Sequence, residues 1–166
     1  MADMESTPEQ VIGITGHRTL SAATRKLVID AVRDELAGMR DLVVVTSLAA
    51  GADQICADVA LEAGGRLVVV VPAQRYEESF SNEIDLTNFT RLLGQAAEVI
   101  SMPFEEPCEE AYWAAGREVV DRAHWLLAVW DGEPARGLGG TADVVAYARS
   151  VGKKAAVIWP EGAARA

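Results

Sequence analysis

The sequence predicts an α/β fold: a doubly wound, mostly parallel, Rossmann-like sheet with helices on both faces. Short valine-rich runs such as 42–46 and 67–71 are apolar at every position, as in strands that are buried on both sides. Segments with apolar residues at helical spacing alternate with these runs along the chain. Alternating strands and helices with right-handed crossovers produce this architecture.

The first half of the chain contains three strand–helix units. A strand at 11–15 leads through Gly16-His17-Arg18 to a helix from about 20 to 37, with Ser21 as a plausible N-cap. A strand at 42–46 and a small-residue turn precede a helix at 53–63, which two glycines end. A third strand at 67–71 stops at a proline.

The second half continues the alternation. A loop at 73–80 is followed by a helix at 82–97 and a short strand at 99–102. A helix at 107–122, a strand at 125–130, a helix at 141–150 and a strand at 155–159 complete the pattern. We expect one domain over 1–166, with 1–9 and 161–166 disordered.

Composition and charge narrow the possible partners. The 166 residues carry a formal net charge of −10, which argues against nucleic acid, because a phosphate backbone favours a basic protein face. A small phosphate ligand needs only a local positive pocket. The two cysteines and an acidic N-terminus without signal-peptide character favour free thiols in the cytoplasm, and no run is long enough to cross a membrane.

Four loops are expected at the carboxyl edge of the sheet, where ligands bind in such folds: 16–18, 47–53, 73–76 and 131–143. In the last, Gly137, Gly139 and Gly140 lie between a buried strand and a helix that opens at Thr141. A strand, a glycine-rich loop and a helix N-terminus together form an anion site. The alternative is an ordinary connection in which Thr141 caps the helix.

Several side chains in these loops are candidate ligand contacts. Arg18 could clamp a phosphate, and His17 beside it could contact the ligand or transfer a proton; both could equally be solvated loop residues. Asp53, after Gly51, could accept from a ribose or simply cap its helix. Arg75, in the loop that follows the third strand, is expected to meet an anion.

The carboxylates of Asp131 and Asp143 suit ribose hydroxyls or a sugar carbon that develops positive charge. Asp131 is followed by Gly132 at the strand end, and Asp143 could alternatively stabilise the dipole of its own helix. Trp130, at the same strand end, is the tryptophan most suited to border a ligand. No G-x-G-x-x-G motif supports NAD binding, and no Cys/His cluster predicts a metal, so no cofactor is expected.

Taken together, VIGITGHR, SLAAGAD, VVVPAQRY and AVWDGEPARGLGGTADVVAYA resemble the SLOG superfamily, from Val11 to Trp159. This group joins the Lonely Guy (LOG) nucleotide hydrolases, also known as lysine decarboxylase-like proteins, with DNA-processing protein A and with sensor domains. The resemblance implies a Rossmann-like fold with a nucleotide or nucleotide-sugar site at the strand ends. It also makes a homodimer plausible, for which Tyr112 and Trp113 are candidate contact residues.

The chain departs from the LOG motif P-G-G-x-G-T-x-E-E. Gly140 and Thr141 match its G-T, Asp143 replaces the first Glu and Val144 replaces the second, while Arg136 replaces the Pro. LOG enzymes also place an arginine on the preceding helix. An ungapped count puts Ala115 there, with Arg117 two residues further on.

Three functions follow as hypotheses. The first is a cytosolic binding protein, such as a signalling sensor, for a nucleotide or nucleotide-sugar phosphate. The second is a LOG-like hydrolase that releases base from nucleoside 5′-monophosphates, with Asp143 and Arg117 as catalytic residues. The third is DNA binding like that of DNA-processing protein A, which the net charge disfavours.

Overall fold

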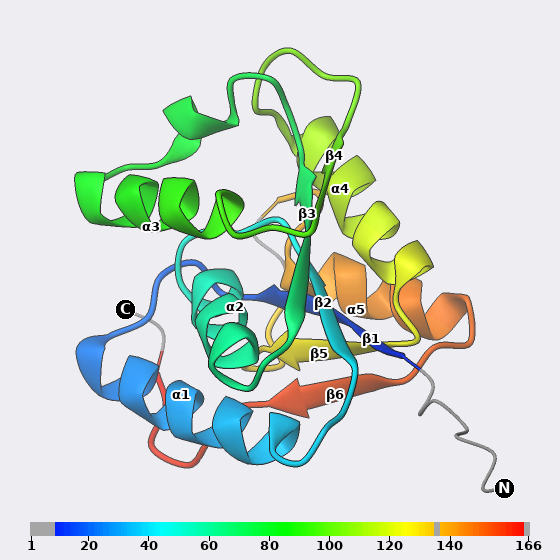
Figure 1. Ribbon diagram of the computed structural model, residues 1–166. Helices are drawn as coiled ribbons and strands as arrows, with labels where there is room; N and C mark the ends of the chain where they lie inside the picture. The colour runs from blue at the N-terminus through cyan, green and yellow to red at the C-terminus, as the bar shows by residue number, and fades with distance from the viewer. Residues whose placement is uncertain (1–8, 135–136, 165–166) are drawn as a thin grey trace, which may run out of the picture.

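The structure is a computed structural model that describes residues 9–134 and 137–164, and it confirms the α/β fold class (Figure 1). Six strands form one sheet: β1 (Gln10–Gly16), β2 (Leu42–Thr46), β3 (Arg66–Val71), β4 (Glu98–Ser101), β5 (Trp125–Val129) and β6 (Ala155–Ile158). The helices in this part of the chain are α1 (Ala22–Leu36), α2 (Ala52–Glu62), α3 (Glu83–Leu93), α4 (Glu109–Arg122) and α5 (Thr141–Ser150), with a 3₁₀ turn, η1 (Tyr76–Ser79).

The strand order is β4-β3-β2-β1-β5-β6, and every pairing is parallel. The chain therefore builds outward from β1 to β4 and then returns to the other side of β1 with β5 and β6. Gly16 pairs with Val129 at the carboxyl ends of β1 and β5, where the direction of winding reverses. Folds of this kind bind ligands in the crevice beyond this switch point.

The sheet buries side chains on both faces, which explains its uninterrupted apolar runs. Along β5, Leu127 and Val129 belong to the core beneath α1 and α2, whereas Leu126 and Ala128 belong to the core beneath α4 and α5. The two helix layers lie on opposite sides of the sheet (Figure 1). The strand ends are thereby held between two packed layers.

Helix boundaries differ from the expected ones for identifiable reasons. The third helix ends at Leu93 and not at 97, because Gly94 caps it and the Ala97 N–H donates to the Leu67 carbonyl, which leads the chain into β4. Helix α4 begins at Glu109 with Cys108 as its N-cap, and not at 107. The expected loop at 73–80 contains the turn η1.

The ends of the chain were expected to be disordered. Residues 1–8 and 165–166 lie outside the described residues. Ala164, however, exchanges two hydrogen bonds with the Thr24 hydroxyl, at 2.9 Å from its amide and 3.0 Å from its carbonyl, so this part of the C-terminal segment is attached to α1. No helix in the described part of the chain is long and apolar enough to cross a bilayer.

Candidate functional site

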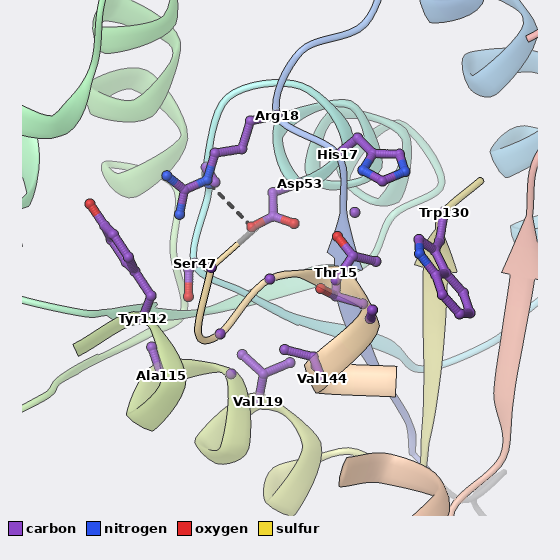
Figure 2. A pocket seen from close by; sticks show the side chains of 18 of the residues that line it. Thr15, His17, Arg18, Ser47, Asp53, Tyr112, Ala115, Val119, Trp130 and Val144 are labelled. Carbon is purple, nitrogen blue, oxygen red and sulfur yellow. Dashed lines mark hydrogen bonds between the residues drawn. The ribbon is translucent and has the colours of Figure 1, made fainter. Parts of the chain in front are cut away.

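A cavity of about 440 Å³ opens at the carboxyl ends of β1, β2, β3 and β5, across the switch point. Figure 2 shows residues that line it. Its floor is apolar and comes largely from α4 and α5, whereas its rim carries charged, hydroxyl and aromatic side chains. Among the sequence-predicted site residues, the cavity is lined by Gly16, His17, Arg18, Asp53, Gly139, Gly140 and Thr141.

Two glycines hold the loop after β1 against the start of α2. A Cβ on Gly16 would lie 2.4 Å from the Ala52 Cβ, so a larger residue would push β1 and α2 apart. Gly51 has a φ of +79°, and a Cβ there would lie 2.5 Å from the carbonyl oxygens of His17 and Arg18. Gly51 is not among the lining residues; it supports the loop that carries Arg18.

Arg18 points into the cavity from this loop (Figure 2). Its guanidinium carbon lies 4.5 Å from the centre of the Tyr112 ring, a cation–π contact that holds the side chain over α4. No carboxylate of the described residues lies within 4 Å of it. The guanidinium is therefore oriented while its hydrogen-bond donors stay available to an anion.

Asp53 is the buried acid of the cavity, with 6% of its surface exposed. Its Oδ2 accepts a hydrogen bond from the Ala49 N–H at 3.2 Å. Burial raises the pKa of Asp53 to about 6, against the lowering effects of the Ala49 hydrogen bond and the charge of Arg18. The carboxyl group therefore changes charge near neutral pH, beside the cation of the site.

His17 connects the loops that follow β1 and β5. Its Nε2 lies 3.1 Å from the backbone N of Asp131 and 3.2 Å from the Asp131 Oδ1, and its ring meets Trp159 edge-on at 5.4 Å. A neutral imidazole can accept from the amide, and a protonated one can donate to the carboxylate. Asp131 itself is outside the cavity lining and acts on it through His17.

The glycine-rich loop lies on the first turns of α4. Gly139 has a φ of +83°, and a Cβ there would lie 2.7 Å from the backbone N of Trp113. Gly140, and not Thr141, is the N-cap of α5, so the alternative in which Thr141 caps the helix is not found. Thr141 instead begins the helix and lines the cavity.

Asp143 and Val144 point in different directions. The Asp143 Oδ2 accepts a hydrogen bond from the Gly139 N–H at 3.0 Å, and Asp143 is not among the residues that line the cavity. Val144 does line it and packs on Gly116 of α4 (Figure 2). The position that matches the second Glu of the LOG motif thus faces the cavity without a carboxylate. Arg136, at the Pro position of that motif, lies outside the described residues.

Three further sequence-predicted residues are also absent from the cavity lining. Arg75 forms ion pairs with Glu105 and Glu106 on the surface. Arg117 is exposed on α4, 5.4 Å from the centre of the Trp113 ring. Gly132 has a φ of +84° in the exposed turn after β5, and a Cβ added there would have no atom of the described residues within 4 Å.

Trp130 was expected to border a ligand, and it does line the cavity, with its Nε1 donating to the Glu133 carbonyl at 2.8 Å.

Other residues that line the cavity were overlooked in the sequence. Tyr112, considered only as a dimer contact, lies beneath Arg18. The hydroxyl and carboxyl groups in the lining that were not named as ligand contacts are those of Thr15, Thr19, Ser47, Tyr76, Glu109 and Glu133. Thr15, Ser47 and Tyr76 lie at a predicted strand end or in a loop that follows one, which was a usable signal; Glu109, at the start of α4, is at the opposite end of its helix from the next strand and gave none.

No protein-family model and no curated protein sequence matches the chain. Among solved structures, DNA processing protein A (DprA) from Streptococcus pneumoniae matches with a TM-score of 0.70 at 20% identity, over 93% of this chain and 52% of that one. The chain therefore has a Rossmann-like fold similar to that of this protein. It spans about half the length of the pneumococcal protein.

Two other structures support the same fold. DprA from Helicobacter pylori, described for its unique mode of single-stranded DNA binding, matches with a TM-score of 0.68 at 18% identity, over 94% of this chain and 68% of that one. TM1055, a structural-genomics target, matches with a TM-score of 0.56 at 13% identity, over 88% of this chain and 72% of that one. The predicted resemblance to the SLOG group is therefore confirmed for the fold.

These matches correct one expectation. The net charge of −10 was used to exclude nucleic acid as a partner, yet a structural neighbour of this chain binds single-stranded DNA. The exclusion was wrong, because net charge describes the whole surface whereas a binding site depends on local charge. Arg18, at the mouth of the cavity with no ion pair among the described residues, is such a local charge.

Proposed function

We propose that the cavity binds the phosphate and nucleoside of a nucleotide or nucleotide-sugar. The observation that carries this proposal is the meeting of Arg18 with the loop from Gly137 to Thr141 in one cavity at the switch point. The first amides of a helix have no hydrogen-bond partner within it and carry partial positive charge. Together with a guanidinium, they favour a phosphate group.

The remainder of the cavity suits a nucleoside. Tyr112 and Trp130 provide aromatic surfaces on different walls, on which a base can stack (Figure 2). Thr15, Ser47 and Asp53 provide oxygen atoms that can bond to ribose hydroxyls. A volume of about 440 Å³ falls within the range of small-molecule sites.

Binding without efficient hydrolysis is the form of this proposal that the side chains favour. Cleavage of an N-glycosidic bond requires a carboxylate that stabilises positive charge on the sugar and positions water. Val144 faces the cavity where the LOG motif has its second Glu, and the Asp143 carboxylate accepts from the Gly139 N–H. Arg117, at 5.4 Å from the Trp113 ring, is not in the lining either.

A second candidate function is binding of single-stranded DNA. It is favoured by the likeness to DprA, one example of which is described as binding single-stranded DNA. In this case the cavity would hold one nucleotide unit of a strand, and Arg18 would contact a backbone phosphate. The two candidates share one phosphate-and-nucleoside site and differ in what is attached to it.

Calorimetric titration of the full chain tests the proposal. A panel of nucleoside 5′-monophosphates, nucleotide-sugars and unphosphorylated nucleosides is compared at one salt concentration, and base release is followed in parallel. We expect phosphorylated compounds to bind more tightly than the matching nucleosides, with little release of base. A short oligothymidine that displaces the bound nucleotide would favour the second candidate. Absence of binding by every compound, including the oligonucleotide, would refute both.

A further inference from the structure

A second hollow of about 440 Å³ adjoins the main cavity. Arg18, Thr19, Ala49 and Tyr76 line both, so the two spaces meet at the loop after β1. The outer wall of the second hollow comes from the start of α1 on one side and from residues 79–82, from the end of η1 to the N-cap of α3, on the other. Nothing in the mononucleotide site described above uses this space.

The second hollow contains two arginines. Arg18 stands between the two spaces, and Arg25 of α1 lines only the second. Among the described residues, no carboxylate lies within 4 Å of either guanidinium. The acid in this wall is Asp85, whose Oδ2 accepts a hydrogen bond from the Asn82 side chain at 2.7 Å. Donors for phosphate oxygens therefore remain in a hollow whose acid is already hydrogen-bonded.

The same hollow includes an aromatic surface. Phe80 is half-buried there, with its ring centre 5.3 Å from that of Tyr76 and 5.0 Å from that of Phe89. These contacts fix the ring in place, and a fixed aromatic face is a stacking surface for a nucleobase. Ser81 adds an exposed hydroxyl beside it. The combination of cations and an aromatic ring repeats that of the main cavity.

We propose that the second hollow binds a second nucleotide unit, so that the natural ligand contains two nucleotides joined through phosphate. Arg18 contacts the linking phosphate, because it lines both spaces, and Arg25 contacts the phosphate of the outer unit. This inference rests on the proposed function of the main cavity and specifies its ligand class. The ligand is either a free dinucleotide or two adjacent units of a single strand, which have the same chemistry.

The test compares thymidine 5′-monophosphate, 5′-phosphorylated dithymidine and 5′-phosphorylated decathymidine, with wild-type protein and two variants. Arg25→Gln removes the outer cation and keeps much of its apolar stem. Lys26→Gln is the matched control, since it removes the same charge from the next, exposed position of α1, outside either hollow. Thermal melting verifies that both variants are folded.

For the wild type, we expect the dinucleotide to bind about tenfold more tightly than the monophosphate, as an added charge-assisted contact provides. Arg25→Gln should remove that gain while leaving monophosphate binding within about twofold, because Arg25 is partly exposed and lies outside the main cavity, where solvent ions screen its charge. It should also make dinucleotide binding less dependent on salt. Loss of one phosphate contact should lower the slope of log affinity against log salt concentration by roughly 0.7. Lys26→Gln should change neither.

The outcomes separate this inference from the function it rests on. Monophosphate binding without a gain for the dinucleotide, or a gain that Arg25→Gln leaves intact, would overturn the second subsite alone. Absence of monophosphate and dinucleotide binding would count against the proposed main site itself. If decathymidine binds much more tightly than dithymidine, the ligand is a strand; equal affinities indicate a free dinucleotide.

Discussion

At the scale of single residues, Asp53 and Arg18 define the electrostatics of the site. Burial raises the pKa of Asp53 from 3.8 to about 6, so its carboxylate costs stability above pH 6 and that cost disappears as the group becomes protonated in the folded protein. Its negative charge also opposes that of a bound phosphate in the same cavity. Protonation of Asp53 should therefore assist anion binding.

We accordingly predict that a phosphodiester ligand binds more tightly as the pH falls from 8 to 5. The probe must be a diester, such as unphosphorylated dithymidine, because its charge is constant over this range whereas a phosphate monoester itself titrates near pH 6. Removal of a like charge about 10 Å away is worth roughly 1.7 kcal/mol at an effective dielectric constant near 20, so we expect the affinity to rise by about tenfold or more. The measurement is the dissociation constant as a function of pH.

Asp53→Asn is the control for that prediction. It fixes this position in an uncharged state, so the variant should bind about as tightly at pH 8 as at pH 5. A variant that keeps the full pH dependence would show that another group is responsible. Weaker binding by the wild type at low pH would show that the ionised Asp53 carboxylate favours ligand binding through its hydrogen-bond partners. Repulsion between Asp53 and the phosphate would then be rejected as the main effect of this carboxylate.

At the scale of elements, the glycine-rich loop between β5 and α5 depends on a backbone that only glycine adopts easily. Gly139 combines a φ of +83° with a virtual Cβ at 2.7 Å from the Trp113 backbone N. Its amide also donates to the Asp143 Oδ2, which fixes the loop to the first turn of α5. The loop is thus positioned by α4 from one side and by α5 from the other.

Gly139→Ala should therefore lower the free energy of unfolding by about 1–3 kcal/mol and weaken phosphate binding, through strain and the clash with α4. Gly152→Ala is the matched control: its φ is +78°, but no atom of the described residues lies within 4 Å of a Cβ added there. The control should incur the backbone strain without displacing the loop. Melting and nucleotide titration distinguish them, and equal loss of nucleotide binding in both variants would contradict this explanation of the loop.

The sequence predicted which strands and helices form better than it predicted the residues at which they end. Apolar runs identified all six strands of the described sheet, because burial on both faces leaves little choice of residue type. The end of α3 was missed because the residues that follow Leu93 are compatible with a helix, and the decisive hydrogen bond, from Ala97 to Leu67, comes from a distant strand. Local propensity does not contain that contact.

At the scale of the whole molecule, the topology explains which candidate residues meet. Parallel strands place the loops after β1, β2 and β5 at one edge, so Arg18, Asp53 and Thr141 line the same cavity. Arg75 follows β3 at the same edge, yet Glu105 and Glu106 pair with it on the surface. A strand-end position could be predicted, but the direction of a long side chain depends on partners distant in sequence.

The pairing of two chains is also a property of the whole molecule. A homodimer through Tyr112 and Trp113 stays a prediction, and both residues are half-buried and already in contact with other side chains. Tyr112 lies under Arg18, and the Trp113 ring meets Tyr147 edge-on at 5.8 Å. Pairing of two chains through these two side chains would therefore compete with the contacts that they already make within one chain.

If Arg18 and the glycine-rich loop hold a phosphate, then substitution of Arg18 should weaken the binding of a phosphorylated ligand selectively. Calorimetry compares a nucleoside 5′-monophosphate with its nucleoside for wild type, Arg18→Gln and the exposed, non-lining control Arg117→Gln. We predict that Arg18→Gln weakens monophosphate binding by about tenfold or more and leaves the nucleoside little changed, as for loss of a charge-assisted hydrogen bond. Arg117→Gln should have no such effect. Equal phosphate binding by wild type and Arg18→Gln, or a loss confined to Arg117→Gln, would contradict the claim.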